Sequence, residues 1–192
     1  RKSSVQILDL ADVGLADRGG AKFFETLLAG KCNFIRSFHL GNNKLTDLAV
    51  GPLIVEVLRS EGCNISTLDI NNNQIGAPVI TQAIKYNRSM TNLDIRECPI
   101  DDDGLGNIGR LLLEPDCMCR MRYISCDAFD IKDGATELKI HKETLGPGET
   151  RLLCGVFKSN NLIKQLDLSG RGIECEAATV LATALTHNTT LK

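Results

Sequence analysis

One pattern of apolar positions recurs along the whole chain. An aliphatic residue is followed three positions later by a triplet whose outer residues are mostly aliphatic and whose middle residue is polar. Six copies begin at Val5, Ile35, Ile65, Met90, Met121 and Ile163, and Leu191 looks like the first residue of a seventh. These starts lie 30, 30, 25, 31, 42 and 28 residues apart, and self-similarity at such a period is typical of repeat architectures.

Each copy predicts one short strand followed by one helix. Apolar residues at helical spacing follow every triplet, within residues 23–28, 53–58, 79–84, 108–112, 152–157 and 180–185. A single strand–helix unit cannot bury its own apolar face, so neighbouring units must stack. Strands are spaced at roughly 4.8 Å and helices are about 10 Å wide, so the stack must curve. The sequence predicts an α/β solenoid of horseshoe shape, with a parallel β-sheet on the concave face and helices on the convex face.

The units resemble a known family. Residues 68–95, LDINNNQIGAPVITQAIKYNRSMTNLDI, are similar to a ribonuclease-inhibitor-type leucine-rich repeat, and the resemblance covers essentially the whole chain. It implies that an Asn or Cys in the loop leaving each strand bonds to neighbouring backbone groups. Three units match this position, at Asn43, Asn73 and Cys98. Three depart from it, at Val13, Phe129 and Arg171, so we expect a weaker ladder in the first, fifth and sixth units.

We expect a single domain. Residues 1–192 are interpreted as one leucine-rich-repeat domain of about six repeats. Neither end carries the polar capping unit that solenoids normally need over their terminal core. This favours a segment of a longer solenoid, or ends that other subunits cover.

The fifth unit is the longest, and its excess lies in residues 129–147. Residues 129–132 and 136–140 alternate apolar and polar side chains on either side of Asp133-Gly134, which is a hairpin signal. We expect a hairpin-like insertion that projects from the edge at which strands lead into helices. Two interpretations stay open: a tolerated surface insertion, and a contact specific to a partner.

Composition narrows the function classes. The chain has 22 Lys+Arg against 24 Asp+Glu, and this balance gives no electrostatic footprint for nucleic acid or an anionic membrane. No apolar run approaches the roughly 18 residues that cross a bilayer. The sequence contains no zinc-protease motif, nucleophile elbow or P-loop. It therefore favours a protein that is not an enzyme and that uses no cofactor and no metal.

One glycine-rich pattern resembles a nucleotide site. Gly104, Gly106 and Gly109 fit G-x-G-x-x-G, but the pattern begins several residues after its strand, whereas a dinucleotide fingerprint follows its strand directly. Small residues recur at the Gly104 position in other units, so we interpret these glycines as helix-packing positions. The aspartates at 101–103 do not complete a calcium loop, because its first and last acidic ligands are missing.

The eight cysteines bear on the compartment. Cys32 and Cys63 both come just before a strand, and Cys98 occupies the Asn/Cys position. Cysteines tied to repeat positions are interpreted as small buried apolar residues, which favours a reducing, cytoplasmic environment. Two of three glycosylation sequons, at Asn87 and Asn188, fall where the repeat itself supplies Asn, so they are weak evidence for secretion.

The concave face carries the candidate binding residues, because the middle residues of the triplets and their neighbours should point into it. The candidate partner-binding residues are Asp9, His39, Asp69, Asn71, Asp94, Arg96, Glu97, Tyr123, Asp127 and Asp167. Asp69 and Asp94 are expected to be direct neighbours, which repel unless a cation or a basic partner compensates them. Two interpretations stay open: hydrated aspartates that are merely common at this position, and an acidic groove for Lys or Arg of a protein partner.

The preferred function is a non-catalytic protein–protein interaction module or scaffold, which also fits a subunit of a larger assembly. The resemblance implies an alternative, an enzyme regulator, because family members inhibit ribonucleases and similar solenoids activate the GTPase Ran. A nuclease inhibitor should have a strongly acidic field and concave aromatic residues, but this chain is nearly neutral, with two Tyr and no Trp. A ligand-sensing array like that of NOD-like receptors is a third interpretation, which needs nucleotide-binding sequence outside this segment.

Overall fold

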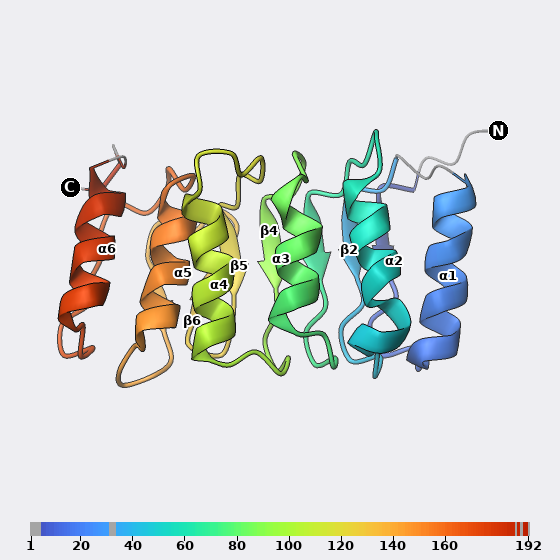
Figure 1. The fold of residues 1–192 in the computed structure, drawn as a ribbon, viewed down its shortest axis with the longest axis horizontal. Coiled ribbons are helices and arrows are strands. Elements are labelled where there is room, and N and C mark those ends of the chain that lie inside the picture. Colours follow the sequence, from blue (N-terminus) through green and yellow to red (C-terminus); the bar gives the residue numbers. More distant parts are fainter. Residues whose placement is uncertain (1–4, 31–33, 187, 189, 192) are drawn as a thin grey trace.

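Short strands and helices alternate along residues 5–30, 34–186, 188 and 190–191, which the computed structural model describes. The first five strands are β1 (Ile7–Asp9), β2 (Ser37–His39), β3 (Thr67–Asp69), β4 (Asn92–Asp94) and β5 (Tyr123–Ser125). The helices are α1 (Ala16–Gly30), α2 (Asp47–Arg59), α3 (Ala77–Lys85), α4 (Asp102–Leu113), α5 (Pro147–Phe157) and α6 (Cys175–Leu185). In Figure 1 the helices form one row that covers one face of the sheet.

The units from β1 to α4 stack in register. Strands β1 to β5 pair in parallel in chain order, which aligns Leu8, Phe38, Leu68, Leu93 and Ile124 in one row. The last four of these side chains are at most 4% exposed. Successive side chains of a strand point to opposite faces, so each central side chain packs under the helices and its two neighbours face away. The predicted leucine-rich-repeat solenoid is therefore confirmed.

The asparagine ladder in the loops after the strands is also confirmed. The side-chain amide of Asn73 donates to the carbonyl groups of Leu40 at 2.9 Å and Ile70 at 3.0 Å. Asn43 repeats this arrangement one unit earlier, and the Cys98 thiol donates to the Ile70 carbonyl at 3.2 Å. Both asparagines are 1% exposed, so they satisfy backbone groups that water cannot reach.

A second asparagine position joins the end of a helix to the following strand. Asn87 is 2% exposed, donates to the carbonyl of Leu58 at 2.7 Å and accepts the N–H of Met90 at 2.7 Å. Asn160 likewise accepts the N–H of Ile163, at 3.0 Å, but its amide donates to the carbonyl of Arg122, just before β5. The repeat thus uses this asparagine for structure, as the sequence pattern indicates for the sequon at Asn87.

The additional residues of the fifth unit form two strands that belong to the sheet. β6 (Phe129–Ile131) and β7 (Lys139–Ile140) pair antiparallel, and β6 also pairs antiparallel with β5. The expectation that this hairpin projects from the strand-to-helix edge is therefore wrong, and the sheet, ordered β1 to β7, is mixed rather than wholly parallel. Phe129 and Ile131 are at most 1% exposed. Burying both side chains, each worth about 1.5–3 kcal/mol, favours the sheet over a projecting hairpin.

The 42 residues between the starts at Met121 and Ile163 contain two successive strand positions but only one helix. No helix lies between β5 and β6, and α5 follows β7. The strand expected at residues 166–168 is not formed, and Gln165 makes only an isolated bridge to Glu137. The places in the sheet after β5 are occupied by β6 and β7 instead. Because β7 has only two residues, it offers few backbone groups for a further ladder.

Helices α4 and α5 are therefore direct neighbours, and glycines let them approach closely. A Cβ on Gly109 would lie 2.4 Å from the backbone nitrogen of Leu152, and a Cβ on Gly148 would lie 1.7 Å from the carbonyl oxygen of Asp102. Backbone contacts this close leave room for glycine alone. The interpretation of the G-x-G-x-x-G glycines as helix-packing positions is confirmed at Gly106 and Gly109, which both contact α5.

Candidate functional site

The exposed face of the sheet, opposite the helices, carries a row of polar side chains. The strand register places Asp9, His39, Asp69, Asp94 and Ser125 side by side, each one strand from the next. The expected neighbour relation between Asp69 and Asp94 is thus present. Side chains directly opposite each other across paired strands lie about 5 Å apart, so the charges in this row act on one another.

The aspartates of the triplets also have a local structural role. Asp9, Asp69 and Asp94 each accept a hydrogen bond from the backbone N–H two residues further on, at 3.0, 3.0 and 3.2 Å. Asp167 does the same at 2.9 Å. Each carboxylate satisfies a backbone donor at the point where the chain leaves the strand position. This turn-forming bond accounts for the recurrence of Asp in the repeat.

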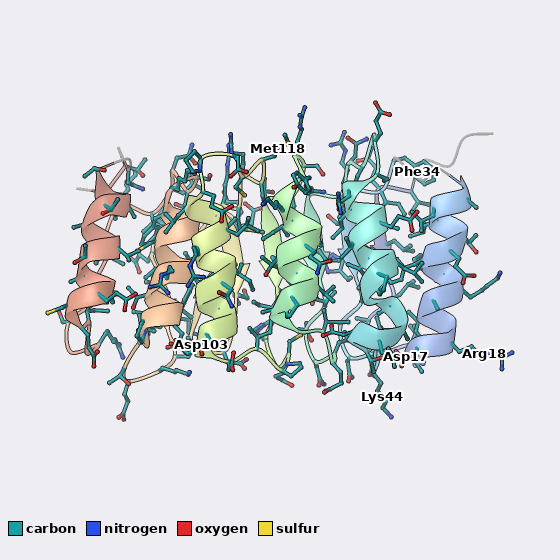
Figure 2. All side chains as sticks on the ribbon, viewed as in Figure 1. Asp17, Arg18, Phe34, Lys44, Asp103 and Met118 are labelled. Atoms are coloured by element: carbon teal, nitrogen blue, oxygen red, sulfur yellow. The ribbon has the colours of Figure 1, made fainter. Side chains whose placement is uncertain are left out.

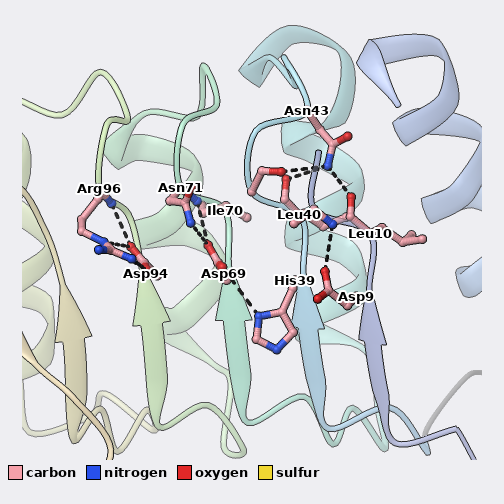
Figure 3. Close-up of polar contacts among 12 residues, drawn as sticks. Asp9, Leu10, His39, Leu40, Asn43, Asp69, Ile70, Asn71, Asp94 and Arg96 are labelled. Carbon is pink, nitrogen blue, oxygen red and sulfur yellow. Dashed lines mark hydrogen bonds and ion pairs between the residues drawn. The ribbon is translucent and has the colours of Figure 1, made fainter. Parts of the chain in front are cut away.

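Two basic side chains of the protein itself, Arg96 and His39, face the two adjacent carboxylates. The Nε atom of Arg96 lies 2.9 and 3.1 Å from the two carboxylate oxygens of Asp94 (Figure 3). This hydrogen bonding raises the pKa of Arg96, although burial opposes the rise. Nδ1 of His39 lies 3.6 Å from Oδ2 of Asp69. Because a guanidinium is always charged and an imidazole only when protonated, the charge of Asp69 is less fully compensated by its neighbour than the charge of Asp94.

The turn of the β6–β7 hairpin folds back over this row. Asp133, in that turn, accepts hydrogen bonds from Asn92 of β4 at 3.5 Å and from the Tyr123 hydroxyl of β5. Burial, and then the Asp133 carboxylate, raise the pKa of Tyr123. A shallow hollow of about 220 Å³ lies beside the turn, and we call it the sheet hollow. Its lining includes His39, Asp69, Asn92, Asp94, Arg96, Tyr123, Lys132 and Asp133.

Five of the predicted residues therefore meet in the sheet hollow, and three others lie near it or at the strand-to-helix edge. The amide of Asn71 donates to Oδ1 of Asp69 at 2.7 Å and so fixes that carboxylate from outside. Asp127 accepts the backbone N–H of Glu97 at 2.8 Å. Glu97 and Asp127 are exposed, and their bond joins two neighbouring loops.

Asp9 and Asp167 belong to the two ends of the chain's repeat series. Asp9 lies on the first strand, next to His39. The expectation that Asp167 follows Ser125 in the row is wrong, because β6 and β7 take that place with Asp130 and Lys139. Asp167 instead lies in a loop, where hydrogen bonds from Ser169 lower its pKa.

Asp130 is a candidate that the sequence pattern did not identify. It pairs in register with Ser125 and Lys139, and its side chain is 5% exposed. Its Oδ2 lies 3.1 Å from Nε2 of His141, and its Oδ1 has no hydrogen-bond partner among the described residues. A buried carboxylate oxygen without a donor costs stability. The alternation over residues 129–131 points Asp130 away from the core, but its place in the row depends on the unforeseen position of the hairpin.

The described residues hold free thiols and no cluster that could bind a metal. No group of three or more His, Cys, Asp or Glu side chains there could hold a metal ion. Seven cysteines are free, while Cys32 lies outside the described residues. Burial raises the pKa of Cys98 and Cys126 to about 11, and of Cys119 and Cys154 to about 12. Such thiols stay protonated near neutral pH and are poor nucleophiles.

The helices of the described part lack the combination of length and apolarity that a membrane crossing requires.

Comparison with known proteins matches this architecture. A family model for the leucine-rich repeat matches residues 86–109. Over 201 residues the chain is 22% identical to human NACHT, LRR and PYD domains-containing protein 5, which covers 96% of this chain and 16% of that protein. It is 26% identical over 176 residues to human NACHT, LRR and PYD domains-containing protein 13, covering 79% of this chain and 17% of that protein.

The pig ribonuclease inhibitor is similar as well, with 22% identity over 212 residues, 88% of this chain and 46% of that protein. The chain therefore spans about a sixth of the two NACHT proteins and less than half of the ribonuclease inhibitor.

Proposed function

We propose, on the premise that this chain is a leucine-rich repeat protein similar to ribonuclease inhibitor, that it is a non-catalytic protein-interaction module. The proposed binding site is the sheet hollow. One observation carries this proposal: Asp133 of the hairpin turn reaches across β5 to Asn92 of β4, so the turn forms a wall at one end of the polar row. A walled hollow that contains Tyr and Arg is typical of sites that anchor a partner's side chains.

We further propose that the partner places a Lys or Arg side chain in this hollow. Among the described residues the ion pair of Asp69 is with the imidazole of His39, at 3.6 Å, and the Arg96 guanidinium acts on Asp69 only weakly, from its place on Asp94. In the same part of the chain no ion pair joins Asp133 to a basic side chain. A cation between these two carboxylates is attracted by both. Arg96 is paired with Asp94, so it does not occupy this position.

A cytoplasmic, reducing environment and membership of a larger assembly belong to the same proposal. Free, buried thiols support a reducing compartment, because cysteines in oxidising compartments are usually paired in disulfides. Membership of an assembly follows if the protein in the hollow is a stable subunit.

Variants that remove carboxylate charge from the sheet hollow test whether it binds a basic partner. Asp69→Asn keeps the oxygen that accepts the Asn71 N–H, and Asp133→Asn keeps an acceptor for Asn92, so the double variant removes charge with little change of shape. The matched control is Asp12→Asn with Asp103→Asn, which removes two exposed carboxylates at the opposite edge from the hollow's wall. Proteins captured from native extract by wild type, variant and control are quantified by mass spectrometry.

Basic proteins that are retained by the control and lost by the hollow variant are the expected result. Equal capture by all three proteins contradicts the proposal. Unfolding curves of the three proteins establish whether the variants keep the fold, so that a loss of binding is assigned to the hollow.

The similarity to pig ribonuclease inhibitor favours a second candidate, an enzyme regulator of the nuclease-inhibitor kind. Hydrolysis of RNA by pancreatic-type ribonuclease is measured with increasing amounts of the protein. Inhibition that Asp69→Asn with Asp133→Asn abolishes would assign this activity to the hollow. Stimulated GTP hydrolysis by a small GTPase, measured in parallel, tests the other regulator that the resemblance implies.

A further inference from the structure

Charge is segregated between the two long edges of the solenoid. In Figure 2, Asp17 and Asp103 mark the edge at which helices begin, while Phe34 and Met118 mark the edge at which helices end. We call the second edge the basic edge. Its described charged residues include Arg36, Arg59, Lys85, Arg88, Arg120, Arg122, Lys158 and Lys164 against Glu61, Glu114 and Asp116, and the hairpin turn adds Lys132, Asp133 and Glu137. The chain's net charge of −2 hides this local excess, because acidic residues gather at the other edge.

Helix stability accounts for only part of this excess. Basic side chains favour the C-terminal ends of helices, and Arg59 and Lys85 lie in the last turns of α2 and α3. Lys158 donates to the last carbonyl groups of α4 at 3.0 to 3.2 Å. Four further arginines lie in loops outside the helices, and they are Arg36, Arg88, Arg120 and Arg122. Within the described ranges no ion pair joins any of them to an acidic side chain.

In the central part of the basic edge, uncharged groups hold the basic side chains in place, so their positive charge is not neutralised. The guanidinium of Arg59 lies 4.9 Å from the centre of the Tyr86 ring, and Nε of Arg88 lies 3.3 Å from the sulfur of Met118. The guanidinium of Arg120 donates to the carbonyl of Cys117 at 2.9 Å. A ring, a thioether and a carbonyl position these groups without neutralising them, so little side-chain entropy is left to lose on binding.

Two loops bring these groups together. The backbone N–H of Met118 donates to the carbonyl of Lys85 at 3.3 Å, which ties the loop after α4 to the end of α3. Tyr86 is 48% exposed and Met118 is 37% exposed. The surface therefore combines arginine, tyrosine and methionine, which are enriched in protein interfaces.

We propose that the basic edge is a second interaction surface and that it binds an acidic segment of a partner protein. Pre-positioned guanidinium groups suit carboxylates, which they bind through paired hydrogen bonds. Tyr86 and Met118 supply apolar contact beside them. This proposal uses no residue of the sheet hollow, so it stands or falls independently of the function proposed above.

The same surface fits nucleic acid less well. Proteins that bind single strands stack bases on open aromatic faces, but Arg59 and Lys85 already lie 4.9 and 5.7 Å from the Tyr86 ring centre. A protein segment with both carboxylates and apolar side chains matches the edge in charge and in composition.

A fluorescence-anisotropy titration tests this. The probe is a short fluorescein-labelled peptide rich in Glu and Leu, and single-stranded poly-dT of similar length is the comparison. The test variant is Arg88→Gln with Arg120→Gln, in which Gln removes the charge and keeps a polar side chain with N–H donors. The matched control is Arg18→Gln with Lys44→Gln, which removes two exposed basic groups from the other edge (Figure 2).

We expect wild type to bind the peptide more tightly than poly-dT, with an affinity that falls as salt rises. The test variant should weaken peptide binding about tenfold, as the loss of two exposed charge pairs predicts, and the control should stay within about twofold. Tighter binding of poly-dT would make the edge a nucleic-acid surface and overturn the proposal. Equal losses in test and control variants, or no binding of the peptide by wild type, would also overturn it.

Discussion

The carboxylate of Asp102, in the first turn of α4, caps a different helix. Its Oδ1 accepts the backbone N–H of Glu149 at 2.9 Å, 47 residues along the chain, and its Oδ2 accepts that of Gly148 at 3.0 Å. Lys158 makes the reverse connection from the end of α5 to the last carbonyl groups of α4. The two helices thus stabilise each other at both ends, across the place where a repeat lacks its helix.

Asp102→Ala should lower the free energy of unfolding by about 1–2 kcal/mol, because two N–H groups at the start of α5 lose their acceptor. Asp103→Ala is the matched control, since Asp103 lies in the same turn and is exposed. It should cost less than about 0.5 kcal/mol. Urea unfolding followed by circular dichroism measures both, and equal losses would contradict the capping role.

Gly109→Ala should destabilise the protein by more than about 2 kcal/mol, because its Cβ would lie 2.4 to 2.5 Å from backbone atoms of α5. Gly19→Ala in α1 is the control. There the new Cβ meets only Leu15, at 3.4 Å, and alanine is about 1 kcal/mol better than glycine in a helix. Opposite signs in the two melting-temperature shifts are expected. A neutral Gly109→Ala would mean that the helices can separate at little cost.

Asn73→Ala should lower the unfolding free energy by about 2–3 kcal/mol, because buried carbonyl and N–H groups of two loops lose their hydrogen bonds to the Asn73 amide. Asn161→Ala, at an exposed loop position, should be nearly neutral. Chemical unfolding is measured for both variants. If Asn73→Ala unfolds like Asn161→Ala, the ladder does not hold the loops.

Alkaline pH should weaken the fold. Cys154 has a pKa raised to about 12 by burial, against an ordinary value of 9.0. Between pH 9 and pH 12 the unfolded thiol loses its proton while the folded thiol keeps it. Stability therefore falls as pH rises, by up to about 1.4 kcal/mol per pH unit for each such thiol.

Cys154→Ala should show a shallower fall than wild type when urea unfolding is followed from pH 8 to pH 10.5. Cys175→Ala removes an exposed thiol and should leave the slope unchanged. A slope that is the same in all three proteins would show that the buried thiol does not titrate on unfolding.

The regular part of this fold can be predicted from short-range pattern alone. The triplet around Leu68 and the amide of Asn73 act within one repeat and its neighbour, so their spacing specifies both the strand and its loop. The row from Asp9 to Ser125 follows directly, because parallel strands in register place equivalent residues side by side. This is why His39, Asp69 and Asp94 meet in one hollow.

The irregular part depends on contacts between residues that the period does not relate. The alternation around Asp130 predicts a strand, but not that Phe129 and Ile131 find their burial beside β5. Once β6 enters the sheet, Asp130 and Lys139 displace Asp167 from the row, and Asp133 reaches Asn92. The ion pair between Arg96 and Asp94 does not follow from the pattern either. The Arg96 side chain reaches Asp94 only because of the conformation of the loop after β4.

The absence of a helix after β5 removes the step that curves the regular units of the solenoid. In a regular unit, one strand step of roughly 4.8 Å accompanies one helix step of about 8–10 Å, so the helical side is the longer arc. From β4 to β7 the sheet takes three steps, roughly 14 Å in all, while α4 and α5 touch. Here the strand side takes the longer path, so the curvature of the regular units does not continue past β5. A rigid partner that fits the curve of β1–β4 therefore meets a differently shaped surface beyond β5.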